Sequence, residues 1–351
     1  MTAPVSGGGE LTAGYLTQAL AGHLDGVTVA AVETSPIGTG QVSDSFRLQL
    51  TYDGPTALPP TMVAKVPAAD PASRNAARTF RTYEIEASFY SEVASDLPVA
   101  LAMCYFAAYH TEQDEYVVLL EDLAPARAGD QLAGITPDQA AAAISELAAL
   151  HAAGWASPAL AALPWLNRAS PDNAALLAAT VTGLYPGFRD RYEACLQPST
   201  LTLIDSFVPH VSDYAGDRDE PSTIVHGDFR ADNLLFGRAR PVVLDWQTCN
   251  FGAGAGDLAY FLASSLQVHH RQHCEEELVR HYHAELTAQG VELTWNDCWN
   301  GYRKHAFSGI VMDIIAAMFV QRTERGDQMF TTMADRHAQH ALDLDALALL
   351  R

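Results

Sequence analysis

The hydrophobic pattern of this 351-residue chain changes once, and that change constrains the fold more than any other feature. From Val27 to Leu120, short segments suited to half-buried strands are separated by turns. After Leu123, apolar residues mostly recur at helical spacing. The pattern predicts an α+β protein with a β-rich N-terminal lobe, residues 1–121, and a helical C-terminal lobe, residues 122–351.

The first lobe is expected to contain a five-stranded antiparallel sheet and one main helix. A glycine-bearing turn lies between the first two strands, and residues 78–94 place aromatic side chains on one helical face. The predicted strands span residues 27–32, 46–50, 61–66, 105–110 and 116–120.

The second lobe is expected to be helical apart from one β-hairpin, residues 233–236 and 242–245. Thr136 and Pro137 are typical of a helix start. The predicted helices span residues 136–151, several segments between 158 and 219, and then 257–268, 274–289, 296–319 and 334–349.

Charge and composition exclude several classes of partner. The formal net charge of -21 repels phosphate backbones, which argues against nucleic acid. No segment approaches the roughly 18 continuous apolar residues of a membrane span, and the N-terminus has no apolar stretch of signal length. The five cysteines form no C-x-x-C pair, which favours a reducing cytoplasm. We expect a cytoplasmic monomer or homodimer.

The segment from His226 to Asn233, His-Gly-Asp-Phe-Arg-Ala-Asp-Asn, carries the strongest chemical pattern. Phosphoryl transfer needs oxygen ligands for Mg²⁺ and a carboxylate that orients the attacking hydroxyl. The predicted hairpin would bring Asn233 and Asp245 together as two such ligands, while Asp228 would face the substrate. Asp232 is a rival for either role, ranked lower because it lies inside the loop.

This motif, with two apolar residues before Asp245, resembles the aminoglycoside phosphotransferase, choline kinase and ecdysteroid-kinase-like group. These proteins are small-molecule relatives of the protein kinases. The resemblance implies a protein-kinase-like bilobal fold that uses ATP and Mg²⁺. It also implies a catalytic base at Asp228, Mg²⁺ ligands at Asn233 and Asp245, and a structural role for His226.

The resemblance extends upstream of the motif. Lys65, flanked by apolar residues on the third strand, is similar to the lysine that grips the phosphates. The following helix would supply the acid that pairs with it. Glu86 and Glu84 are both candidates, and Glu86 is preferred because of the aromatic pair that follows it.

Further segments resemble the family's nucleotide contacts. The turn Gly38-Thr-Gly40-Gln-Val-Ser43-Asp-Ser45 falls where a loop would cover the phosphates, although it lacks a third glycine. Glu121 and Leu123 resemble the hinge whose backbone would contact adenine. Asp257 resembles an aspartate that supports the catalytic loop through hydrogen bonds, and an ordinary helix cap is the alternative.

The departures from the protein kinases favour a small acceptor. Trp246-Gln247 follows Asp245, and no activation segment separates Asp245 from Asp257. We therefore expect phosphorylation of a hydroxyl group on a small molecule: an amino-sugar, an amino-alcohol or an apolar hydroxylated compound. The preference between ATP and GTP stays open. The alternative is a catalytically silent pseudokinase that acts through a partner, although such proteins commonly lose a residue that this chain keeps.

Two sets of residues leave the acceptor and a second metal site undecided. His269 and His273, one helical turn apart, suggest a metal site, but a solvent-facing cluster on a polar helix is favoured. The acceptor would lie against variable helices that carry both acids, which suit an amine, and aromatic residues, which suit an apolar ring. These are Asp190, Glu193, Asp205, Asp297 and Asp313, and Phe188, Tyr192, Phe207, Trp299, Tyr302 and Phe319.

Overall fold

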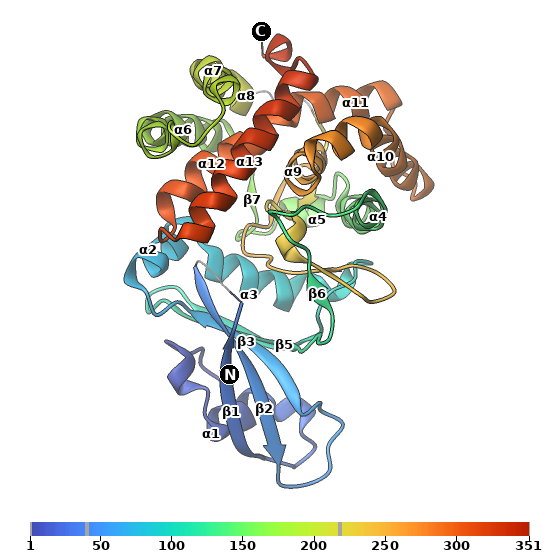
Figure 1. Ribbon diagram of the computed structural model, residues 1–351. Helices are drawn as coiled ribbons and strands as arrows, with labels where there is room; N and C mark the ends of the chain where they lie inside the picture. The colour runs from blue at the N-terminus through green and yellow to red at the C-terminus, as the bar shows by residue number, and fades with distance from the viewer. Residues whose placement is uncertain (1, 39–41, 217–219, 351) are drawn as a thin grey trace.

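The structure, a computed structural model, describes residues 2–38, 42–216 and 220–350. A lobe built around a sheet lies below a larger helical lobe in Figure 1. The sheet is antiparallel, with the strand order β1-β2-β3-β5-β4. All five predicted strands are confirmed: β1 (Val29–Ile37), β2 (Ser43–Tyr52), β3 (Thr61–Pro67), β4 (Cys104–His110) and β5 (Glu115–Glu121).

Alternation along the strands gives the sheet two buried faces. Residues such as Leu48, Met62 and Leu119 pack in one cluster with the helix α1 (Ala13–Ala19). Tyr116 and its same-face neighbours join the core that continues into the helical lobe. The second face is therefore the one that meets the rest of the molecule, and the site lies on that side.

The predicted helix over residues 78–94 is wrong in its extent. Two helices occur instead, α2 (Pro71–Phe80) and α3 (Thr82–Glu92), joined at Arg81. Arg81 adopts a left-handed conformation, with φ of 58°, which ends α2 and starts α3 in a new direction. Apolar spacing continues across this joint, so the periodicity gave no sign of it.

The second lobe is helical, as expected, with corrected limits. Residues 296–319 form two helices rather than one, and the last helix begins ten residues before the predicted 334. None of the helices in the described ranges is long and apolar enough to cross a membrane. The helices are α4 (Pro137–Gly154), α5 (Pro158–Ala161), α6 (Pro171–Tyr192), α7 (Pro198–Phe207), α8 (Val211–Gly216), α9 (Gly254–Ser265), α10 (Val268–Ala288), α11 (Trp295–Lys304), α12 (Ser308–Phe319) and α13 (Glu324–Asp343).

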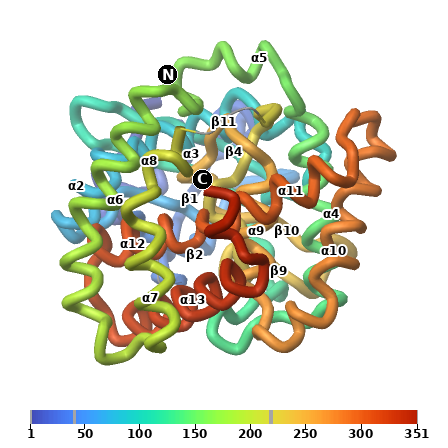
Figure 2. Tube along the Cα trace, turned by 90° about the horizontal axis from the view of Figure 1, so that it is seen from above, coloured from blue at the N-terminus to red at the C-terminus, as the bar shows by residue number. Residues whose placement is uncertain are grey.

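These helices surround a central one. Seen from above in Figure 2, α4 and α10 lie on one side of the molecule and α6, α7 and α12 on the other. Helix α9, almost wholly buried, packs against α4, α11, α12 and α13. Because α9 has buried neighbours on every side, the side chains at its start are held rigidly beside the loop that they contact.

Short strands complete the second lobe. The predicted hairpin is present as β9 (Leu234–Phe236) and β10 (Val242–Val243), and β6 (Arg127–Ala128) pairs with β9. A second small sheet was not predicted: β7 (Asn167–Arg168), β11 (Asn250–Ala253) and β8 (Ser222–Val225). Strands of two to four residues are too short to carry a detectable alternation. The sheet fixes the residue before His226, because Val225 pairs with Asn250.

Thr136 provides a measurable test of the helix-start prediction. Its side chain accepts a hydrogen bond from the Gln139 N–H, and the Gln139 side-chain oxygen accepts one from the Thr136 N–H, forming a capping box at α4. We expect Thr136→Ala to lower the free energy of unfolding by about 1 kcal/mol in chemical denaturation. The control is Thr180→Ala, a partly exposed threonine inside α6, which should not destabilise the protein. Equal effects would contradict the capping role.

Candidate active site

Lys65 contacts two acids from distant parts of the chain, Glu86 on α3 and Asp245 after β10. It occupies the middle of β3, opposite Ser45 on β2 and Val118 on β5. Its Nζ lies 2.6 Å from Glu86 Oε1 and 2.8 Å from Asp245 Oδ1, and its side chain is only 11% exposed. Burial alone would lower the pKa of Lys65, but the two carboxylates outweigh it and raise the pKa, so the ammonium stays charged.

Glu86 is the acid that pairs with Lys65. It is buried on α3 and also accepts hydrogen bonds from the Tyr116 hydroxyl and, at 3.3 Å, from the Trp246 N–H. Glu84 turns away and pairs with Arg81 at 2.6 Å. The sequence left both glutamates open as partners of Lys65, and in the structure Glu86 forms the ion pair.

Asp245 follows β10 in a left-handed conformation, with φ of 67°. The predicted hairpin extended to this residue, but its positive φ ends the strand pairing at Val243. Burial would raise the pKa of Asp245, but the Lys65 ammonium outweighs it and keeps the pKa below its usual range. The next residue, Trp246, stacks on Phe89 of α3 at 4.0 Å between ring centroids, which anchors the segment to the first lobe.

Asp228 is held by three side chains. Its Oδ1 accepts from the Tyr260 hydroxyl at 2.7 Å, its Oδ2 accepts from Asn233 Nδ2 at 2.8 Å, and Arg230 Nε lies 3.1 Å from both oxygens. Because the Asn233 amide nitrogen is used in this way, its amide oxygen remains for another partner. The Asn233 carbonyl accepts from the Leu244 N–H at 2.9 Å, so Asn233 lies beside the residue before Asp245.

Asp257, on α9, fixes the start of the loop. Its carboxylate accepts from the backbone N–H groups of His226, at 2.6 Å, and Gly227, at 2.9 Å. Burial would raise its pKa, but hydrogen bonding and the charge of His151 keep the pKa below its usual range. Asp257 therefore supports the loop and does not cap α9, whose N-cap residue is Ala253.

The loop has no room for a side chain at its glycine. Gly227 has φ of 82°, and a Cβ there would lie 2.5 Å from the Thr248 carbonyl oxygen. His226 links the loop to the hairpin, because its Nε2 is 2.8 Å from the Leu244 carbonyl oxygen. These contacts are those of a structural residue, and they hold Asp228 at a fixed distance from the hairpin.

The site includes residues that the sequence analysis missed. Arg230 lies inside the quoted motif, but only the structure places it against Asp228. Tyr260 lies three residues after Asp257, so one helical turn brings both to the loop, a spacing that could have identified it. No sequence spacing indicated the contacts of three other residues, because their partners, Glu86 and Asp257, are distant in the sequence. These residues are Tyr116, Trp246 and His151.

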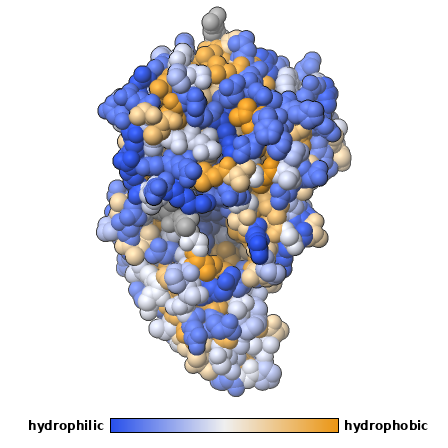
Figure 3. Space-filling view, in the orientation of Figure 1, coloured by the Kyte–Doolittle hydropathy of each residue, from blue (hydrophilic) through white to orange (hydrophobic). Residues whose placement is uncertain are grey.

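The predicted nucleotide contacts belong to the first lobe and to the connection between the lobes. A hollow between the lobes is visible in Figure 3. Gly38, with φ of 71°, ends the described part of the turn after β1, while Ser43 and Ser45 lie on β2. Gly40 lies outside the described residues. Glu121 ends β5, and its N–H donates to the Met103 carbonyl at 2.8 Å. Leu123 follows in the connection between the lobes, where its adenine contact stays a prediction.

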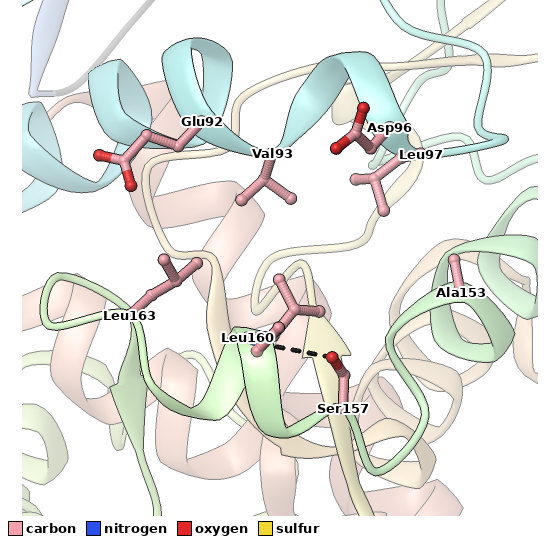
Figure 4. A pocket seen from close by; sticks show the side chains of 9 residues that line it. Glu92, Val93, Asp96, Leu97, Ala153, Ser157, Leu160 and Leu163 are labelled. Atoms are coloured by element: carbon pink, nitrogen blue, oxygen red, sulfur yellow. Dashed lines mark hydrogen bonds between the residues drawn. The ribbon is translucent and has the colours of Figure 1, made fainter.

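Two other features lie apart from these residues. His269 and His273 are exposed on α10, and no cluster of metal-binding side chains occurs among the described residues. A cavity of about 300 Å³ lies between the end of α3 and the segment around α5. In Figure 4, Glu92, Val93 and Asp96 line it from above and Leu160 from below. None of the predicted site residues lines this cavity.

The model of the Ecdysteroid kinase-like family matches residues 38–294 of the chain. This range includes Lys65, Glu86, the loop around Asp228 and Asp257. The chain belongs to the Ecdysteroid kinase-like family. No curated protein matches the sequence.

Solved structures show the same fold. A choline kinase from Cryptosporidium parvum Iowa II has a TM-score of 0.55 and 12% identity, with 90% of this chain and 89% of that chain covered. A putative aminoglycoside phosphotransferase from Ralstonia eutropha JMP134 has a TM-score of 0.53 and 17% identity, with 93% and 97% covered. Identity this low establishes the fold alone. The predicted protein-kinase-like bilobal α+β fold is confirmed.

The Lys65–Glu86 pair gives a matched mutational test on one helix. In Glu86→Gln, an amide nitrogen would face the Lys65 ammonium or the Tyr116 hydroxyl, so we expect the free energy of unfolding to fall by about 3 kcal/mol. Glu84→Gln removes only a partly exposed pair with Arg81, so the expected loss is below about 1 kcal/mol. Denaturant titration measures both, and a larger loss in Glu84→Gln would contradict the assignment.

Proposed function

We propose that this protein transfers the γ-phosphoryl group of ATP to a hydroxyl group of a small molecule, with Mg²⁺. The acceptor is an amino-sugar, an amino-alcohol or an apolar hydroxylated compound. The single observation that carries the proposal is the continuous arrangement of Lys65, Asp245, Asn233 and Asp228 across the two lobes. Lys65 contacts Asp245 at 2.8 Å and Asn233 contacts Asp228 at 2.8 Å, while Asn233 and Leu244 are joined through the backbone.

Asp228 would act as the base in this reaction. A hydroxyl bound beside it would lose its proton to the carboxylate as its oxygen bonds to the γ-phosphorus, and the bond to the departing ADP oxygen would break. Tyr260 and Asn233 support this role because they hold the carboxylate with donors at 2.7 and 2.8 Å.

Lys65 would hold the phosphates, since it is a buried cation on the face of the sheet turned toward the hairpin. The turn with Gly38, Ser43 and Ser45 would cover them, and the backbone of Glu121 and Leu123 would contact the base of the nucleotide. Similar folds support nucleotide binding. One relative is described as the GDP complex of aminoglycoside 2'-phosphotransferase-IIIa, with a TM-score of 0.52, 14% identity, and 93% and 99% coverage.

Asn233 and Asp245 would hold Mg²⁺. The hydrogen bonds of Asn233 to Asp228 use its amide nitrogen, so its amide oxygen is available as a ligand. The lowered pKa keeps Asp245 ionised. Both residues thus supply the oxygen donors that Mg²⁺ prefers. Bound Mg²⁺ would offset the charge that develops on the phosphates. Asp232, the rival ligand, accepts from the Gln131 N–H and pairs with Arg230, so its contacts lead away from Lys65.

The alternative is a pseudokinase that binds a nucleotide and acts through a partner. Such a protein has no need to keep the base, the lysine and both oxygen ligands in contact with one another. The packing of Lys65, Glu86 and Asp245 into one ion network therefore favours an enzyme. A cytoplasmic location and a monomeric or dimeric state remain part of the proposal.

The test is a screen for ADP release with Mg²⁺ and ATP over amino-sugars, amino-alcohols and hydroxylated apolar compounds. We expect one class to stimulate turnover and to yield a phosphate ester in phosphorus NMR. Tight nucleotide binding with no ester from any class would favour the pseudokinase.

The base is tested by Asp228→Asn, which keeps the shape of the side chain but removes its charge. We expect kcat to fall by about 10²–10⁴-fold, because the proton acceptor is lost, while the affinity for MgADP measured by calorimetry stays within about twofold. Asp138→Asn, an exposed acid at the start of α4, is the control and should retain activity. Full turnover in Asp228→Asn would refute the role of the base.

A further inference from the structure

Arg230 contacts the proposed base, Asp228, and further contacts fix the position of its guanidinium group. The Nε–H lies 3.1 Å from both oxygens of Asp228, so it fixes the plane of that carboxylate. The Nη1 group contacts Asp232 at 3.0 Å and the Met329 sulfur of α13 at 3.5 Å. With 16% of its side chain exposed, Arg230 is largely buried between the loop and Met329 of α13.

The charges around the loop cancel one another. Asp232 pairs with Arg230 and, at 3.5 Å, with Arg325 of α13, so two carboxylates face two guanidinium groups. Burial would lower the pKa of Arg230, but Asp228 and its neighbours outweigh it and raise the pKa, so the guanidinium is permanently charged. A hydroxyl that reaches Asp228 thus also meets a fixed cation.

The acids considered as amine ligands are mostly engaged elsewhere. Asp205 is bonded to Tyr185 and Arg189, and Asp297 to Thr294. Asp313, the buried acid of α12, lies 2.7 Å from His337 Nδ1. Binding an ammonium group at Asp205 or Asp297 would therefore require breaking existing contacts. One oxygen of Asp313 has no hydrogen-bond partner, but only 1% of that side chain is exposed.

We propose that Arg230 is a positioning residue for Asp228 and that it selects acceptors without a cationic group beside the reacting hydroxyl. This inference rests on the proposed function and narrows its acceptor. The Asp228 carboxylate is already paired with the Arg230 guanidinium, so an ammonium group placed beside it would gain no uncompensated negative charge and would lie close to a like charge. A neutral hydroxylated compound is not repelled by Arg230. We therefore expect such a compound to be a better acceptor than an amino-alcohol or amino-sugar whose amine lies next to the reacting hydroxyl.

The positioning role is tested without an identified acceptor, by following hydrolysis of MgATP by water. We expect Arg230→Ala to lower kcat about 10–100-fold with little change in the KM for ATP, since a misplaced base affects chemistry rather than nucleotide binding. Guanidinium chloride at millimolar concentration should restore part of the lost rate, and Arg230→Lys should be intermediate. Arg280→Gln, an exposed arginine on α10, is the control and should keep the wild-type rate.

A purely structural role for Arg230 predicts a different result: lower thermal stability, no rescue by guanidinium and no separation of kcat from KM. That outcome, or a wild-type rate in folded Arg230→Ala, overturns the positioning role. Hydrolysis in the wild type that is no faster than in Asp228→Asn would instead mean that the proposed function has failed.

The charge selection is tested with two alcohols of equal shape, choline and its neutral isostere 3,3-dimethylbutan-1-ol. We expect the neutral alcohol to stimulate MgATP turnover by the wild type at least about tenfold more than choline does, and Arg230→Gln to narrow this ratio several-fold. An equal response to both alcohols in the wild type, a larger response to choline, or an unchanged ratio in Arg230→Gln would contradict the selection.

Discussion

The ion network of Lys65 with Glu86 and Asp245 joins three parts of the chain that lie up to 180 residues apart. Lys65 lies on β3, Glu86 on α3 and Asp245 after β10. The network therefore connects the sheet, the helix α3 and the hairpin of β9 and β10. A buried cation of this kind is costly unless both partners are in place. The hairpin, the stacking of Trp246 on Phe89 and the packing of α3 on the sheet all serve to keep them there.

A second set of contacts holds Asp228, the proposed base. Asp257 holds the backbone of His226 and Gly227, and the Tyr260 hydroxyl, one turn further along α9, holds the Asp228 carboxylate. Because α9 is buried on all sides, this support is rigid. The two sets meet at Asn233, whose side chain contacts Asp228 and whose backbone contacts Leu244. The proposed chemistry depends on their being connected.

The features that could be predicted from the sequence are those that local patterns of residues determine. Strand alternation gave the five strands of the first sheet, and the motif around Asp228 gave the family. It could not predict contacts set by tertiary packing. The left-handed Arg81 divides a helix whose apolar spacing is unbroken, and the sheet of β7, β11 and β8 consists of strands too short to alternate. Arg230 was visible in the motif, but nothing in its spacing indicated that its guanidinium faces the base.

In the proposed function, Asp245 and Asn233 would hold Mg²⁺ beside the bound nucleotide. Calorimetric titration of ADP with and without Mg²⁺ tests it most directly, in the wild type, in Asp245→Asn and in the control His273→Ala. The account predicts that Mg²⁺ tightens ADP binding at least about tenfold in the wild type and in His273→Ala, and has no such effect in Asp245→Asn. The same Mg²⁺ dependence in Asp245→Asn, or its loss in His273→Ala, would contradict the account.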